Sequence, residues 1–275
     1  MRKAIMCGLA VLSTAGCVDV PVDSSARRQA VHVAGVELAP GAREKVTLHF
    51  LVRAYTEAEL EDVGSFCEEQ YTKIMRNTGL YSFMPATPYE IIIYSSHEEY
   101  VNRSKQPDWS GGVTIGNAIL SYNSQAMKSV LAHEMAHLVF NEYMSRSDYR
   151  LVWLNEGLAV YTQIGTYGDA GQASYNSAVR AELLASPIPF ARMMSYVPMR
   201  DAGTNGGTQL SRWYGQAGSV AEYMIERGGS MGFSMLLREL KNGAGIDSAL
   251  ASAYPGKWSD TAALEAGWLA YLKGQ

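Results

Sequence analysis

The strongest constraint on how this chain folds is the segment His133-Glu134-Met135-Ala136-His137, which places two histidines four residues apart. Apolar residues flank the segment on both sides, including Leu131 and Leu138, which predicts a helix that runs through the protein interior. About one helical turn separates the two imidazoles, so both project from one face and can reach a single ion. The chain is therefore expected to bury a helix that carries a metal site.

The chemistry of this pattern points to zinc. Two histidines at this spacing, with a glutamate directly after the first, are typical of zinc sites. Zinc lowers the pKa of a bound water towards neutrality, and a carboxylate on the same edge of the helix can accept the proton of that water. The sequence therefore predicts that His133 and His137 bind one zinc ion and that Glu134 acts as a general base.

A third protein ligand is expected at Glu156, which lies in the segment Trp153-Leu154-Asn155-Glu156-Gly157-Leu158-Ala159. A carboxylate inside an otherwise apolar helix is costly unless it is paired or binds a metal. Eighteen residues lie between His137 and Glu156, enough to end one helix and return a second helix against it. Asn155 is a candidate to orient one of the ligands.

The residues after these ligands discriminate between classes of zinc site. A metzincin continues with a glycine and a third histidine at the positions that Phe140 and Tyr143 occupy here, so that class is excluded. A thermolysin-like helix usually carries an aspartate four residues after the glutamate ligand, whereas this chain has Val160 there.

HEMAH, WLNEGLAVY and the gap between them resemble the gluzincin metallopeptidases, within them the peptidase MA-like group related to aminopeptidase N. The resemblance extends weakly over residues 45–272. It implies a zincin-like fold, zinc bound by His133, His137 and Glu156, and Glu134 as the general base of peptide-bond hydrolysis. The implied partner is a peptide or protein substrate.

The same resemblance implies roles for two further segments, which match the family less specifically. Residues 109–122 are similar to the family's segment that ends in the edge strand of the cleft, where a peptide could add a strand. Residues 212–219 are similar to the segment in which relatives place a tyrosine that donates a hydrogen bond to the tetrahedral intermediate, which makes Tyr214 the candidate. A plain structural strand and a packing tyrosine are the respective alternatives.

One departure from the family bears on specificity. Aminopeptidases of this clan hold the free amine of the substrate with an acidic residue in a glycine-rich motif. The matching region here, GGVTIGNAIL, contains no Asp or Glu. The resemblance therefore favours an endopeptidase over an aminopeptidase.

The order of the elements predicts an α+β fold with a small N-terminal mixed sheet and the active-site helix, followed by a mostly helical part. Strand patterns occupy residues 46–52, 89–94 and 113–122, the last interrupted at Gly116, and residues 56–77 have the pattern of a long helix. Asn123 and Ser124 are candidates to cap the helix of His133. The segment 186–208, with three prolines, is expected to be a long loop that borders the cleft.

The first 17 residues have the features of an export signal, with a basic start, a short apolar run and small residues before Cys17. Thr14-Ala15-Gly16-Cys17 resembles a bacterial lipobox, which predicts a lipid anchor on Cys17 in a bacterial membrane, in the periplasm or at the cell surface. A cleaved signal and a secreted protein are the alternative. Residues 18–44 are then a tether, and residues 45–275 are the metallopeptidase domain, divided at about residue 143.

The formal charge bears on the partners that the chain can bind, and the cysteine content bears on the disulfide bonds that it can form. The formal net charge is -4, with acidic and basic residues interspersed, so a nucleic-acid partner is not expected. Beyond Cys17 only Cys67 remains, and it falls at an apolar position of a helical pattern, so it is predicted to be a buried structural thiol.

Three functions stay open at this level. The first is an endopeptidase outside the cytoplasm, since zinc ligands and base are all present. The second is a catalytically inactive, zinc-containing binding or structural lipoprotein. The third is an aminopeptidase or another hydrolase on the same fold. Glu134 favours an enzyme, because an unligated carboxylate beside the metal has catalytic use and little structural value.

Overall fold

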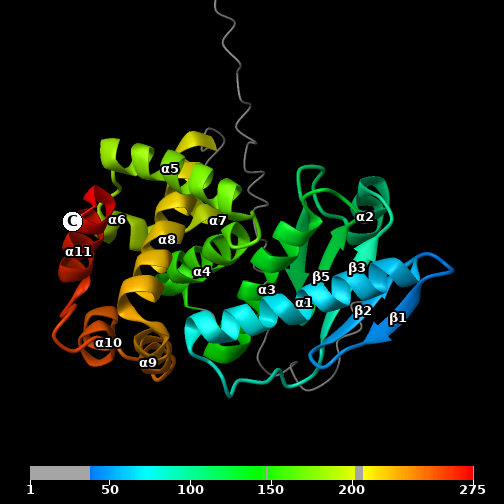
Figure 1. The fold of residues 1–275 in the computed structure, drawn as a ribbon, viewed down its shortest axis with the longest axis horizontal. Coiled ribbons are helices and arrows are strands. Elements are labelled where there is room, and N and C mark those ends of the chain that lie inside the picture. Colours follow the sequence, from blue (N-terminus) through cyan, green and yellow to red (C-terminus); the bar gives the residue numbers. More distant parts are fainter. Residues whose placement is uncertain (1–37, 147, 202–206, 275) are drawn as a thin grey trace, which may run out of the picture.

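The computed structural model describes residues 38–146, 148–201 and 207–274, and Figure 1 shows a sheet region beside a helical region. A small sheet comes first and helices make up most of the second half, so the predicted α+β class is confirmed. The export signal with Cys17 and residues 18–37 of the expected tether lie outside the described residues.

The strands are β1 (Arg43–Val46), β2 (Phe50–Ala54), β3 (Tyr89–Tyr94), β4 (Gly112–Ile115) and β5 (Ala118–Tyr122). The helices are α1 (Glu57–Thr78), α2 (His97–Ser104), α3 (Met127–Met144), α4 (Val152–Ile164), α5 (Asp169–Ala185), α6 (Phe190–Ser195), α7 (Pro198–Asp201), α8 (Gly207–Gly228), α9 (Ser230–Lys241), α10 (Ile246–Ala253) and α11 (Thr261–Lys273). A single 3₁₀ turn, Tyr149–Leu151, leads into α4.

The strands form one mixed sheet in the order β1-β2-β3-β5-β4. β3 pairs in parallel with both β2 and β5, whereas β1 with β2 and β4 with β5 are antiparallel pairs. β4 is therefore an edge strand among the described strands, whereas the resemblance implied an edge strand at the end of the segment 109–122, where β5 instead pairs on both sides.

The prediction of one strand over residues 46–52 is wrong, because the chain turns there to form the hairpin of β1 and β2. The backbone N–H of Thr47 donates to the carbonyl of Phe50 at 2.8 Å. The Thr47 hydroxyl also donates to Glu68 Oε1 at 2.6 Å, which ties the turn to α1. Alternation of apolar residues continues across so tight a turn, so the pattern does not reveal it.

The predicted long helix is confirmed as α1, and its first turn shows why it begins there. The Thr56 side chain accepts a hydrogen bond from the backbone of Glu59, and the Glu59 carboxylate accepts one from the backbone of Thr56. This capping box satisfies two amide groups that the first turn leaves without helical partners. α1 buries Cys67 completely, and this burial raises the pKa of its thiol far above the usual range, which agrees with a structural thiol.

The predicted cap of the helix of His133 is wrong. α3 begins at Met127, and Ala126 precedes it without a side-chain hydrogen bond to the helix. Ser124 instead accepts the Met127 N–H through its backbone carbonyl at 3.1 Å, and the Asn123 side chain donates to Glu59 at 3.0 Å. These two residues make a turn and a contact to α1 before the helix starts.

The expected long loop over residues 186–208 contains two short helices, α6 and α7, in its described part, so that prediction is also wrong. Its residues are anchored to α8. Gln216 exchanges two hydrogen bonds with the backbone of Ile188, at 2.6 and 2.8 Å, and the Trp213 indole donates to the carbonyl of Met193 at 2.9 Å. These buried polar contacts join the segment to a helix that is distant in the sequence, so no local sequence pattern predicts them.

α4 lies at the centre of the fold, between α3 and α8 (Figure 1). Its contact with α8 depends on Gly157, because a Cβ atom there would lie 2.4 Å from the carbonyl oxygen of Ala217. One continuous core joins both regions and includes Trp153, Trp213 and Trp268, each almost fully buried. In the part of the chain that the structure describes, the helices are too short or too polar to cross a membrane.

Candidate metal centre

α3 and α4 bring the three predicted ligands to one point. His133 and His137 project from α3, and Glu156 projects from α4, and their ligand atoms all lie within 4.8 Å of one another. The Nε2 atoms of the two histidines are 3.2 Å apart. Glu156 Oε2 lies 3.4 Å from Nε2 of His137 and 3.7 Å from Nε2 of His133.

These distances fit a zinc ion. Ligand atoms bound to tetrahedral zinc at about 2.05 Å lie about 3.3 Å from one another, which agrees with the spacing of the three atoms. Oε2 of Glu156 is also buried, and no hydrogen bond satisfies it among the described residues. A buried carboxylate oxygen in this state is costly unless a cation occupies the space in front of it.

The outer nitrogens of both imidazoles face side-chain amides. His137 Nδ1 lies 2.9 Å from Oδ1 of Asn155, and His133 Nδ1 lies 3.1 Å from Oε1 of Gln163. Because an amide oxygen only accepts, each Nδ1 carries the proton and donates it, which leaves each Nε2 with a lone pair directed at the site. Two such lone pairs at 3.2 Å repel each other unless a metal ion lies between them.

The electrostatics of the pocket keep the His133 imidazole in the form that a metal needs. Burial and the neighbouring His137 lower the pKa of His133 to about 3. His133 is therefore neutral at pH 7, and a neutral imidazole binds a metal without first releasing a proton.

Glu134 lies beside the ligands on α3 and is almost fully buried, with 1% of its surface exposed. The hydroxyl of Thr114, on the edge strand β4, donates to Oε2 of Glu134 at 2.7 Å. β4 approaches α3 this closely because residue 112 is glycine, and a Cβ atom there would lie 2.5 Å from a methyl group of Val130. The contact fixes one oxygen of the carboxylate that the sequence predicts as general base.

Two residues of the site were not predicted from the sequence. Gln163 lies seven residues after Glu156, which is about two helical turns, so this spacing places both on one face of α4 and could have pointed to it. Thr114 comes from a different element, and nothing in the local pattern links it to Glu134. Asn155, predicted as a candidate to orient one of the ligands, contacts His137 and donates from its amide nitrogen to Asn141 at 3.2 Å.

Tyr214 lies on α8, the helix that packs against the opposite side of α4 from α3. Its side chain is buried, and its ring stands edge-on to Trp213 at 5.1 Å between centroids. These contacts do not test the role of its hydroxyl in catalysis, which stays a prediction.

A sequence model of the Peptidase MA superfamily matches residues 67–274. The match includes α3 and α4 and therefore both histidines, Glu134 and Glu156. No curated protein matches the chain. Members of the matched family are typically zinc-dependent, which agrees with the geometry of the three ligands.

Proposed function

The chain belongs to the Peptidase MA superfamily, and from this premise we propose that it is a zinc-dependent endopeptidase of the gluzincin class. The observation that carries the proposal is the convergence of His133, His137 and Glu156 at distances that suit one zinc ion, with Glu134 on the same helix. The family supplies the reaction class, and the residues supply the ligands and the base.

The chain's own residues account for the proton transfers of peptide hydrolysis. A zinc ion held by the three ligands would polarise the scissile carbonyl and lower the pKa of a water. Glu134 then takes the proton from the attacking water and passes it to the leaving amine. Thr114 holds the Glu134 carboxylate at 2.7 Å, so that it does not have to be ordered when substrate binds. Tyr214 is the proposed donor to the oxyanion.

The position of β4 at the edge of the sheet supports the binding of a substrate in an extended conformation. Among the described strands, β4 pairs with β5 alone, so the other side of β4 can pair with the backbone of a peptide. Thr114 ties this strand to Glu134, which places a peptide bound along β4 near the base. The absence of Asp and Glu from residues 111–120 supports cleavage within a chain over removal of a terminal residue.

We test the proposal on residues 19–275, by measuring bound metal and by exposing a mixed peptide library to the protein with and without a chelator. We expect one zinc per chain and cleavage at internal peptide bonds, lost with the chelator and restored by zinc. Glu134→Gln keeps the metal and loses cleavage, because the amide cannot accept the proton.

Each failure identifies a different alternative. Zinc binding without any cleavage supports an inactive binding or structural protein. Stepwise release of single N-terminal residues supports an aminopeptidase. A protein without stoichiometric zinc contradicts both the enzyme and the zinc-binding alternative.

Export and lipid attachment are a separate proposal. We propose that Cys17 carries a lipid that anchors the protein to a bacterial membrane, with its catalytic part outside the cytoplasm. Labelling of the full chain with a fatty-acid probe in a bacterial host should be lost in Cys17→Ser. Labelling that persists in this variant, or a wild-type chain secreted without label, contradicts the proposal.

A further inference from the structure

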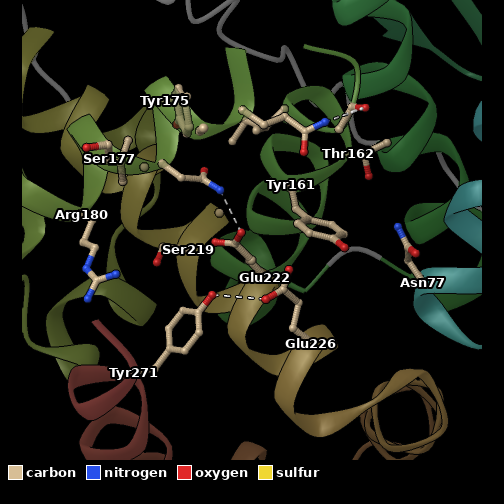
Figure 2. Close-up of a pocket in the computed structure, with 18 of the residues that line it drawn as sticks. Asn77, Tyr161, Thr162, Tyr175, Ser177, Arg180, Ser219, Glu222, Glu226 and Tyr271 are labelled. Carbon is tan, nitrogen blue, oxygen red and sulfur yellow. Dashed lines mark hydrogen bonds between the residues drawn. The ribbon is translucent and has the colours of Figure 1, made fainter. Parts of the chain in front are cut away.

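A cavity of about 590 Å³ lies among the ends of α1 and α4 and helices α5, α8 and α11 (Figure 2). Gly165, which directly follows α4, lines it and comes nine residues after Glu156, which is about two and a half helical turns. Because Glu156 and Gln163 face α3, the cavity lies on the other side of α4 from the metal centre. The proposed peptidase reaction does not use it.

Two carboxylates line the cavity from successive turns of α8 (Figure 2). The amide nitrogen of Asn176 donates to Glu222 at 3.1 Å, and the hydroxyl of Tyr271 donates to Glu226 at 3.2 Å. Among the described residues, no Lys, Arg or His lies within 4.0 Å of either carboxylate. Like charges four residues apart on a helix repel each other, so this pair lacks the cation that would offset the repulsion.

The neighbouring carboxylate of Glu226 affects the pKa of Glu222. Burial and the neighbouring Glu226 raise the pKa of Glu222 to about 7, and the hydrogen bond from Asn176 only partly opposes them. A cation bound between the carboxylates would favour their ionised form.

Tyrosines form much of the wall around the two carboxylates. Tyr161, Tyr175 and Tyr271 all line the cavity, and the charge of Glu222 contributes to raising the pKa of each. The hydroxyl oxygen of Tyr175 is buried, and no hydrogen bond satisfies it in the part of the chain that is described. Aromatic faces next to carboxylates suit an organic cation, and the rings of Tyr161 and Tyr175 offer them, whereas Arg227 already lies over the ring of Tyr271 at 5.4 Å.

The basic residues of the cavity lie near its mouth. Lys73 is paired with Glu69 at 2.7 Å, and Arg76 and Arg180 are exposed to solvent, which screens their charge. They leave the carboxylates unneutralised and disfavour a ligand that is cationic along its whole length. The ligand that fits has one compact cationic end.

We propose that this cavity binds a primary ammonium group at Glu222 and Glu226, supplied either by a free amine or by a lysine side chain of a polypeptide. The N–H donors of an ammonium group match the acceptor oxygens of the two carboxylates. The volume beyond these groups holds the carbon chain that carries the nitrogen. The site would take its ligand whether or not the metal centre hydrolyses peptides.

The test is calorimetric titration of residues 19–275 with two amines and their uncharged counterparts. The pairs are 1,5-diaminopentane with 1,5-pentanediol, and Nα-acetyl-lysine methylamide with Nα-acetyl-norleucine methylamide. We expect one amine per chain, bound at least ten times more tightly than its counterpart. Chelated, metal-free protein should bind equally well, which separates this site from the metal centre.

Two variants locate the binding. Glu222→Gln with Glu226→Gln should weaken amine binding at least tenfold. Glu98→Gln, an exposed carboxylate on α2, is the matched control and should leave it unchanged. Thermal melting confirms that each variant is folded.

The outcomes separate the possible ligands. Tighter binding of the diamine than of the lysine derivative indicates a free amine, and the reverse order indicates a polypeptide side chain. Equal binding of amines and uncharged counterparts, or unchanged binding in the Glu222/Glu226 variant, contradicts the proposal. Binding of Ca²⁺ or inorganic phosphate in place of the amines, measured in the same way, also overturns it.

Discussion

The hydroxyl of Thr114 lies 2.7 Å from Oε2 of Glu134, so the edge strand of the sheet holds the carboxylate proposed as general base. Glu134 is almost fully buried, and a buried carboxylate depends on such donors because water does not reach it easily. The contact links two parts of the proposed machinery, the strand expected to bind the peptide and the helix that carries the two histidines of the candidate metal centre.

Replacing Thr114 by Val should therefore lower kcat for peptide cleavage by about ten- to hundredfold, the range expected when a hydrogen bond to a charged group is lost. Valine has nearly the shape of threonine, so the zinc content should stay at the wild-type level. Thr114→Ser keeps the hydroxyl and should restore most of the activity. If the valine variant cleaves peptides at the wild-type rate, Thr114 has only a packing role.

Asn155 should control metal affinity, because its amide oxygen accepts the proton of His137 Nδ1 at 2.9 Å. Loss of such a partner lowers metal affinity by about 10- to 100-fold. We expect this loss in Asn155→Ala, measured by competition with a zinc chelator of known affinity. Asn102→Ala on α2, where the side chain is exposed, is the control. An unchanged zinc affinity in Asn155→Ala would show that the amide contact does not orient the ligand.

Removal of the metal should lower the melting temperature. The folded chain presents three ligand atoms within 4.8 Å of one another, and an unfolded chain does not. At a free zinc concentration of about 100 Kd the bound ion contributes about 2.7 kcal/mol, which corresponds to roughly 5 to 10 °C for a domain of this size. His137→Ala should melt at the same temperature with and without zinc. An equal zinc-induced rise in that variant would place the metal elsewhere.

Gly157 should be intolerant of any side chain, because its position against α8 has no room for a Cβ atom. In Gly157→Ala the new methyl group meets the carbonyl oxygen of Ala217, so α4 or α8 must move, at a cost of about 1 to 3 kcal/mol. Gly207→Ala is the matched control, since nothing lies within 4 Å of its Cβ position. We expect chemical denaturation to show a loss of stability in the first variant and none in the second. Equal stability of both would mean that the two helices are not tightly packed.

The ligands could be predicted from the sequence because each leaves a local mark. His133 and His137 stand one helical turn apart, and Glu156 is a costly charge in an apolar helix. Gln163 follows the same helical spacing, but a glutamine is common on helices and carries no such cost. The α+β order of the elements could be predicted for the same reason, since the hydrophobic periodicities of strands and helices are properties of short segments.

Tertiary contacts explain what the sequence did not reveal. Thr114 reaches Glu134 only because β4 pairs with β5 and lies against α3. The hairpin at Thr47 and the start of α3 at Met127 likewise depend on contacts to α1, at Glu68 and Glu59. No short window of sequence contains both partners of these contacts, so each prediction based on a local pattern failed there.

Glu222 should make the stability of the protein depend on pH, and a single substitution at this position can reveal the dependence. Its pKa in the folded protein is about 7, whereas the ordinary pKa of a glutamate side chain is 4.5, so between these pH values the folded chain holds a proton that the unfolded chain has released. Stability from this group is therefore greatest at low pH and falls as the pH rises from about 4.5 to about 7.

Glu222→Gln removes the ionisable group, so the variant does not lose stability through this group as the pH rises. After allowance for partial exposure, we expect the variant to gain about 1 kcal/mol over wild type at pH 8, or roughly 2 to 4 °C in melting temperature. At pH 5, where the unfolded chain has begun to release the proton and the folded chain still holds it, the gain should be about a quarter as large. Glu98→Gln should show no such change between the two pH values. A gain of the same size at pH 5 and pH 8 would mean that Glu222 titrates normally and that its neighbour Glu226 does not repel it. Addition of 1,5-diaminopentane at pH 8 should then raise the melting temperature of wild type more than that of the variant, because only wild type has both carboxylates to stabilise the ammonium group.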